Sequence, residues 1–388
     1  MTAADGGRER VDAADDIRFE IRGRIGRVTL NRPRAINALT HDMVSRLQAA
    51  LVSWAQDDTV AAVLIVGEGE RGLCAGGDIV ALYRDAVAGD DTEAAAYWRD
   101  EYVLNGYIAR YPKPYIAIMD GIVLGGGIGV SAHGSHRIVT ERSRLGMPET
   151  GIGFVPDVGG TWLLSHAPGE LGTLLALTAG SMAAADAIAL GFADAFVRSA
   201  DLPELLSALE AEALDATSLD AVIGRFATDP GPVDLAAQRD WADDAFTGAD
   251  LQEIIAQVRA SGEVGATVAD ALAGKSPTAM SVALAALRRV AGMRTIEEAL
   301  DQEYRVSLRA FAAPDFAEGV RAQVIDKDRD PHWRPARVDD VNPADVAAYF
   351  VSLGGRELAL SPKTALCAPQ DTQAPDAQSS GATSEGRA

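Results

Sequence analysis

The clearest periodic segment of the chain lies at residues 40–56, where apolar side chains return at every third or fourth position. This spacing places them on one face of an α-helix, and Thr40 is a residue type that caps a helix at its start. The predicted apolar face consists of Met43, Val44, Leu47, Leu51 and Trp54. We therefore expect an amphipathic helix here.

Shorter apolar runs predict strands on both sides of this helix. Residues 17–33 carry Gly23 and Gly26 between two apolar-rich halves, which is typical of a β-hairpin. Continuous apolar runs predict buried strands at 61–67, 114–121 and 136–140. From residue 200 to 312 the strand signals disappear, and amphipathic helical patterns take their place.

This order of patterns predicts the fold class and the extent of its parts. Strands that alternate with helices, followed by a helical stretch, are typical of an α/β core with a helical C-terminal region. We assign the α/β core to residues 17–199 and the helical C-terminal region to 200–360. The two ends, 1–16 and 361–388, are polar and poor in large apolar residues, so we expect a disordered N-terminal arm and a disordered tail.

Composition narrows the classes of function. The 388 residues are 48% hydrophobic and 23% charged, as in an ordinary soluble protein. A net charge of −21 disfavours a nucleic-acid partner, because such a surface repels a phosphate backbone. No uncharged apolar run approaches the roughly 20 residues that span a bilayer, and residues 1–16 lack the apolar core of a secretory signal. Cys74 and Cys367 form no disulfide framework, so we expect a cytoplasmic protein without a membrane partner.

Two acids lie on proline- and glycine-rich turns within residues 147–161, MPETGIGFVPDVGGT. Glu149 and Asp157 each follow a proline directly. Two ordinary interpretations are open at this point: Glu149 as a solvated loop residue, and Asp157 as the cap of a helix that begins within residues 158–165. The alternative is a pair of rigidly held functional carboxylates.

Two glycine-rich turns also follow predicted strands. The first, LCAGGDI at 73–79, leads into a helix near Asp78, and its glycines allow the N–H of Gly77 to face a ligand carbonyl. A loop that merely needs positive φ is the ordinary alternative. The second turn, within 120–134, opens a helix at about Gly126, whose free N–H groups and dipole favour developing negative charge.

Several competing chemistries fit the sequence poorly. Gly127, Gly129 and Ala132 match a dinucleotide fingerprint, but the strand that should end in an acid about 20 residues later is missing. No nucleophilic-serine elbow is present, since His133 stands where its second glycine should be. No metal-ligand spacing of His or Cys occurs, and Cys74 is better explained as a small buried residue. Two oxyanion donors beside carboxylates remain, a set suited to work on the carbonyl region of a thioester or enolate.

These segments resemble the enoyl-CoA hydratase/isomerase (crotonase) superfamily. The resemblance covers about residues 17–198 through LNRPRAINAL, CAGGDI, KPYIAIMDGIVLGGGIG and MPETGIGFVPDVGG. It implies a crotonase-like spiral of ββα units followed by a helical C-terminal region. Within the superfamily, the segments WRDEYVLN, GFVPDVGGTWLL, SPTAM and DFAEGVRAQVIDKDRDPHWRP are similar to the 3-hydroxyisobutyryl-CoA hydrolase subgroup.

The resemblance assigns roles residue by residue. It implies that the N–H groups of Gly77 and Gly126 form the oxyanion hole. Glu149 matches the catalytic glutamate, and Asp157 matches the second acid of the hydrolase subgroup. Glu101 matches a substrate-contacting acid, for which a solvated charge on a helix is the ordinary alternative. Glu149, Asp157 and Gly126 are also expected to contact the substrate.

One departure from the hydratases bears on the reaction. Gly129 stands where hydratases carry their other glutamate, so addition of water to a double bond is disfavoured. The resemblance implies hydrolysis of a short β-hydroxyacyl-CoA, namely 3-hydroxyisobutyryl-CoA to 3-hydroxyisobutyrate and CoA in valine catabolism. An isomerase or hydratase acting on a fatty acyl-CoA and a non-catalytic acyl-CoA-binding protein remain alternatives. No cofactor is expected, because coenzyme A is part of the substrate, and the superfamily suggests a homo-oligomer, a trimer or hexamer.

Overall fold

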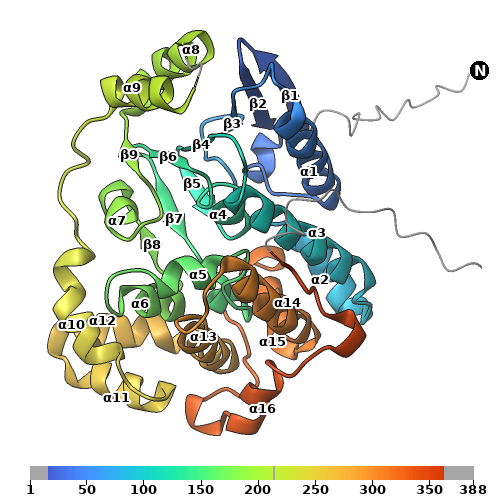
Figure 1. Ribbon diagram of the computed structural model, residues 1–388. Coiled ribbons are helices and arrows are strands. Elements are labelled where there is room, and N and C mark those ends of the chain that lie inside the picture. Colours follow the sequence, from blue (N-terminus) through green and yellow to red (C-terminus); the bar gives the residue numbers. More distant parts are fainter. Residues whose placement is uncertain (1–15, 213–214, 362–388) are drawn as a thin grey trace, which may run out of the picture.

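A computed structural model describes residues 16–212 and 215–361 (Figure 1). The predicted disordered arm and tail lie outside these described residues, apart from Asp16 and Ser361. Within them, no helix is long and apolar enough to cross a bilayer.

Two sheets form the N-terminal part of the chain. The larger has the order β1-β2-β3-β4-β6-β9, and only the β1–β2 pair in it is antiparallel. Its strands are β1 (Ile17–Arg22), β2 (Ile25–Leu30), β3 (Ala62–Gly67), β4 (Tyr115–Met119), β6 (His136–Val139) and β9 (Ala195–Phe196). The smaller sheet has the order β5-β7-β8 and consists of β5 (Ile122–Leu124), β7 (Arg144–Gly146) and β8 (Ser181–Met182).

The hairpin, β3, β4, β6 and the first helix are where the sequence predicts them, whereas β5, β7, β8 and β9 were not predicted. The predicted hairpin is confirmed, with Ile17 opposite Leu30 across β1 and β2. Gly26 lies inside β2 rather than in the turn, and a Cβ there would stand 2.6 Å from the Trp54 ring. Helix α1 (His41–Gln56) buries the predicted apolar face, and the Thr40 hydroxyl accepts a hydrogen bond from the Met43 N–H at 3.3 Å. The further helices of this part are α2 (Ile79–Ala88), α3 (Thr92–Ala109), α4 (Gly126–Gly129), α5 (Gly160–Ser165), α6 (Leu171–Thr178) and α7 (Ala184–Ala189).

After β9 the described residues contain helices and loops but no strand, as the sequence predicts. The helices are α8 (Leu202–Glu212), α9 (Ala216–Phe226), α10 (Arg239–Phe246), α11 (Leu251–Ala260), α12 (Gly262–Ala273), α13 (Pro277–Val290), α14 (Ile296–Ala312), α15 (Pro314–Val320) and α16 (Pro343–Ala348). Figure 1 shows α8 and α9 at one end of the molecule, whereas α10–α16 gather at the other. Leu205 of α8 and Leu219 of α9 share a small core with Leu64 and Ile116 of the large sheet.

The C-terminal helices reach the glycine-rich turns of the N-terminal part. Helix α14 packs along α3, and α15 packs against α2 and against the turn at Glu149–Ile152 (Figure 1). The last contact is made by backbone, because a Cβ at Gly319 of α15 would lie 2.3 Å from the carbonyl carbon of Ile152. Chain segments about one half of the sequence apart therefore meet at the place where the candidate site lies.

Candidate active site

The turn that carries Gly77 joins β3 to α2. Gly76 has φ +110°, a conformation that side chains disfavour, and α2 begins at Ile79 after Asp78. Arg32 fixes this corner by donating a hydrogen bond to Oδ2 of Asp78 at 2.9 Å. A Cβ at Gly77 would stand 2.6 Å from the Tyr97 hydroxyl, so the position has no room for a side chain.

The second glycine turn meets the first. Gly125 has φ +50° and precedes α4. A Cβ at Gly126 would stand 3.2 Å from the Gly77 nitrogen and 2.7 Å from Oε1 of Glu101. Among the described residues, neither Gly77 nor Gly126 donates its N–H to a protein acceptor. Because α4 has only four residues, its dipole is short, and these two free donors themselves are what the site offers to an oxyanion.

Glu149 begins a single 3₁₀ turn after β7 and is 6% exposed. Its Oε1 lies 2.9 Å from the place a Cβ would take at Gly125, and its Oε2 has no hydrogen-bond partner in the part of the chain that the structure describes. Burial, and then the charge of Asp157, raise the pKa of Glu149 well above its usual range. The interpretation of Glu149 as a solvated loop acid is therefore wrong, and a buried oxygen without a partner is typical of a functional group.

Asp157 is also 6% exposed, and the Tyr102 hydroxyl donates to its Oδ2 at 2.7 Å. Burial raises the pKa of Asp157 to about 7, against the hydrogen bond from Tyr102. The interpretation of Asp157 as a helix cap is wrong. Helix α5 begins at Gly160, and the N–H groups of Gly159 and Thr161 donate to Glu303 instead.

Glu101 lies inside α3 and is only 2% exposed. The Tyr97 hydroxyl, one helical turn earlier, donates to its Oε1 at 2.9 Å. Burial and the charge of Asp157 raise the pKa of Glu101 well above its usual range, which the bond from Tyr97 opposes. Glu101 is therefore no solvated surface charge, and its contact with a substrate stays a prediction.

All five residues that the sequence singled out line one cavity of about 240 Å³. These are Gly77, Glu101, Gly126, Glu149 and Asp157. Its apolar walls come from both halves of the chain and include Trp98, Leu124, Phe154, Phe316 and Val324. The structure thus brings two free N–H donors and three buried carboxyl groups to one apolar space.

Sequence reasoning missed three polar residues of this region. Tyr97 is one helical turn before Glu101, so its spacing carried a signal. Tyr102 and Glu303 carried none, because each reaches the site only through a contact across more than 50 residues.

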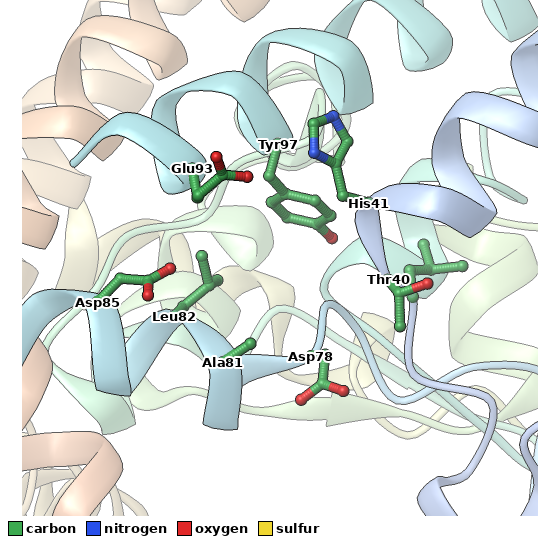
Figure 2. Close-up of a pocket in the computed structure, with 9 residues that line it drawn as sticks. Thr40, His41, Asp78, Ala81, Leu82, Asp85, Glu93 and Tyr97 are labelled. Atoms are coloured by element: carbon green, nitrogen blue, oxygen red, sulfur yellow. The ribbon is translucent and has the colours of Figure 1, made fainter. Parts of the chain in front are cut away.

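A second cavity of about 290 Å³ adjoins the first, and Leu82 and Tyr97 line both (Figure 2). Figure 2 shows Tyr97 between His41 of α1 and Leu82 of α2. Nε2 of His41 lies 2.7 Å from a carboxylate oxygen of Asp100, and this hydrogen bond raises the pKa of the imidazole. Tyr97 therefore lies between the cavity of the five residues and this second cavity.

The position that hydratases give to their other glutamate is filled by neighbours. A Cβ at Gly129 would stand 2.7 Å from the Asn105 amide nitrogen and 2.7 Å from Cβ of Val158. A larger side chain at this position would require both neighbours to move.

Cys74 is the remaining nucleophile candidate within the described residues. Cys74 is fully buried, as expected, and burial raises the pKa of its thiol to about 12, so the reactive thiolate is disfavoured. Cys367 lies outside the described residues. Across residues 16–212 and 215–361, no three His, Cys, Asp or Glu side chains are arranged to hold a metal ion.

The family model for enoyl-CoA hydratase/isomerase matches residues 25–350. The chain belongs to this family. Among curated relatives, the 3-hydroxyisobutyryl-CoA hydrolase of Gallus gallus is 36% identical over 361 residues, 91% of this chain and 93% of that protein. The protein of the same name from Rattus norvegicus is 38% identical over 354 residues, 88% of this chain and 90% of the relative. Both names carry the word mitochondrial, and the cytoplasmic location expected for this chain stays a prediction.

Two solved structures are similar to this chain over nearly their whole length. A carnitinyl-CoA dehydratase from Mycobacterium thermoresistibile is 48% identical with a TM-score of 0.84, over 88% of this chain and 98% of that one. An enoyl-CoA hydratase from Rhodobacter sphaeroides is 43% identical with a TM-score of 0.81, over 89% of this chain and 100% of that one. The predicted crotonase-like α/β fold is confirmed. The names of all four of these proteins refer to CoA esters.

Proposed function

We propose that this chain is an acyl-CoA thioester hydrolase that converts 3-hydroxyisobutyryl-CoA to 3-hydroxyisobutyrate and CoA, as in valine catabolism. One observation carries the proposal: Glu149 and Asp157 face the same cavity as the free N–H groups of Gly77 and Gly126. The curated relatives named for this reaction support it.

In this mechanism the thioester oxygen lies between the N–H groups of Gly77 and Gly126. As a nucleophile attacks the carbonyl carbon, negative charge grows on that oxygen, and donors already in place stabilise it without rearrangement. The apolar walls of the cavity exclude water from these donors, which strengthens the interaction. Glu101 lies beside Gly126 and is assigned to contact the substrate.

Glu149 acts on the carbonyl carbon by one of two routes. As a nucleophile, its carboxylate forms a bond to that carbon, the carbon–sulfur bond breaks, and water then hydrolyses the mixed anhydride. As a general base, it removes a proton from the attacking water directly. Single-turnover hydrolysis in ¹⁸O-labelled water distinguishes them, because only the anhydride route moves label into the Glu149 carboxylate.

Asp157 supplies a proton to the departing thiolate. Neighbouring buried carboxyl groups disfavour simultaneous ionisation, and burial raises the pKa of both Glu149 and Asp157. In the state with Glu149 ionised, Asp157 keeps its proton and passes it to the thiolate sulfur. It also orients the water or the substrate hydroxyl. No metal or redox cofactor takes part, and coenzyme A enters as part of the substrate.

A hydratase or isomerase activity is the second candidate, since the two similar solved structures carry hydratase and dehydratase names. One-step hydration uses two carboxylates, and the space around Gly129 that a second glutamate would need is filled by Asn105 and Val158. Isomerisation needs only the acid at Glu149. One comparison distinguishes the hydrolase from a hydratase or isomerase. Release of free thiol from 3-hydroxyisobutyryl-CoA is measured beside loss of enoyl absorbance from crotonyl-CoA. Binding without either turnover would identify a non-catalytic acyl-CoA-binding protein.

We also propose that the chain forms a homo-oligomer. The expected homo-oligomer, a trimer or hexamer, is checked by light scattering on the purified chain.

A further inference from the structure

The turn that carries Asp157 has an unusual backbone. The Gly160 N–H donates to the Asp157 carbonyl at 2.6 Å, and the two residues between them have positive φ, +54° at Val158 and +78° at Gly159. These angles are typical of a type I′ turn, which favours asparagine followed by glycine. A β-branched valine is strongly disfavoured there, so the surrounding structure has to hold it.

Part of that support is packing. Val158 is 1% exposed, and its Cβ lies 2.7 Å from where a Cβ would stand at Gly129. The valine side chain thus lies directly over Gly129 of α4. Packing alone does not fix the peptide groups of the turn, which need hydrogen-bond partners because they are buried.

Two side chains provide those partners, the buried Glu303 and the half-buried His133. Glu303 of α14, 1% exposed, accepts from the Gly159 N–H at 2.7 Å through Oε2, and from the Thr161 N–H at 3.0 Å through Oε1. The Thr161 hydroxyl also bonds to Oε1. On the other side, His133 Nε2 lies 2.7 Å from the Val158 carbonyl oxygen, so this nitrogen carries a proton and donates.

Helix α14 reaches Asp157 by a second path. Ser307 lies one helical turn after Glu303, on the same buried face. Its hydroxyl is 2.7 Å from the Tyr102 hydroxyl, which in turn donates to Oδ2 of Asp157 at 2.7 Å. One face of α14 therefore fixes both the backbone beside Asp157 and the direction of its carboxylate.

We propose that Glu303 is a positioning residue of the hydrolysis: it holds the strained turn at Val158 and Gly159 so that Asp157 faces Glu149 and the thioester. This inference rests on the proposed function. Glu303 does not line the cavity of the five residues, so it acts on the reaction through residues that do: it holds the turn beside Asp157, and its charge also raises the pKa of Glu149.

Glu303→Gln tests the inference with little change in shape. Its amide nitrogen replaces one carboxylate oxygen and points at the N–H of either Gly159 or Thr161, so one acceptor is lost. We expect kcat for thiol release to fall at least about tenfold, with KM within about threefold of wild type. The matched control is Glu297→Gln on the same helix. Glu297 is equally buried at 1% exposure, but it accepts hydrogen bonds from Arg110 and none from the turn. The kcat of Glu297→Gln should stay within about twofold of wild type.

A second substitution separates positioning from general stability. Glycine adopts positive φ freely, so Val158→Gly should restore kcat at least about fivefold in the Glu303→Gln background, although it removes packing. A residue that only stabilises the fold gives no such rescue. Equal losses of kcat in Glu303→Gln and Glu297→Gln, or absence of rescue by Val158→Gly, would overturn the inference.

Amide hydrogen exchange provides a readout that does not depend on turnover. The Gly159 and Thr161 amides should exchange at least about tenfold faster in Glu303→Gln than in wild type, and at the wild-type rate in Glu297→Gln. If wild type releases no thiol, the proposed function fails. Hydrogen exchange then still tests whether Glu303 fixes the turn at Val158 and Gly159. Unchanged exchange of both amides would overturn the inference itself.

Discussion

Asp157→Asn separates the effect of this acid on the stability of the protein from its role in the reaction, because the change removes the charge and keeps the shape. Burial raises the pKa of Asp157 from 3.8 to about 7. The folded chain therefore binds this proton more tightly than the unfolded chain does. Where the folded state binds more protons, the free energy of unfolding falls as pH rises, here between about pH 4 and pH 7.

The magnitude follows from the size of the shift. One pKa unit corresponds to about 1.4 kcal/mol, so a rise of roughly three units makes the ionised carboxylate cost about 4 kcal/mol of stability above pH 7. Asparagine has no such cost, and its carbonyl oxygen can still accept the bond from Tyr102. We expect Asp157→Asn to be more stable than wild type at pH 8, by up to about 4 kcal/mol, and similar to it at pH 4.

The same variant should be a poorer enzyme. Thiol release is expected to fall at least tenfold, about 1.4 kcal/mol of barrier, because the thiolate loses its proton donor. Urea unfolding at pH 4 and pH 8 measures the first effect, and a thiol assay with 3-hydroxyisobutyryl-CoA measures the second. Equal stability of variant and wild type at pH 8 would refute the buried, proton-retaining state of Asp157. An unchanged rate of hydrolysis would remove Asp157 from the mechanism.

Three further predictions concern the other catalytic groups and the tail. Glu149→Gln should lower thiol release by about 10²–10⁴-fold without unfolding the chain, and a rate within about threefold of wild type would exclude Glu149 as base or nucleophile. Gly126→Pro removes an oxyanion donor and should reduce kcat by the equivalent of roughly 3–4 kcal/mol. Gly126→Ala also places a Cβ near Glu101 but keeps the N–H, so equal losses in both variants would indicate crowding instead. Removal of residues 361–388 should leave the melting temperature and the activity unchanged, and a large loss in either would show that the tail docks.

The sequence predicted local structure well because local signals decide it. The spacing of apolar residues in α1 and the glycine of the β1–β2 hairpin act over a few positions. The glycine turns at Gly77 and Gly126 were likewise readable, since each follows a strong strand signal. Their meeting within one site was implied by the family resemblance and not by any spacing along the chain.

The sequence could not reveal hydrogen-bond partners and burial that arise only when distant segments of the chain pack together. Asp157 looked like a helix cap because its residue type and place suit that role. In the structure Glu303, from a helix more than 140 residues later, accepts hydrogen bonds from two N–H groups at that helix start, those of Gly159 and Thr161. The burial of Glu101 was equally hidden, because α3 is covered by α14 only after the chain has turned back.

The carboxylates that line the cavity also bear on what happens after bond cleavage. The proposed reaction converts a neutral acyl group into an acid that is ionised at neutral pH, and it does so beside Glu101, Glu149 and Asp157. Burial raises the pKa of all three side chains, and the charge of Asp157 raises that of Glu101 and Glu149 further, which means that this space disfavours negative charge. The same walls that accept an uncharged thioester are therefore unfavourable to the product anion. Release of the hydroxy acid follows from this low tolerance for a further anion, and acyl groups that carry a second carboxylate are disfavoured when they enter the cavity.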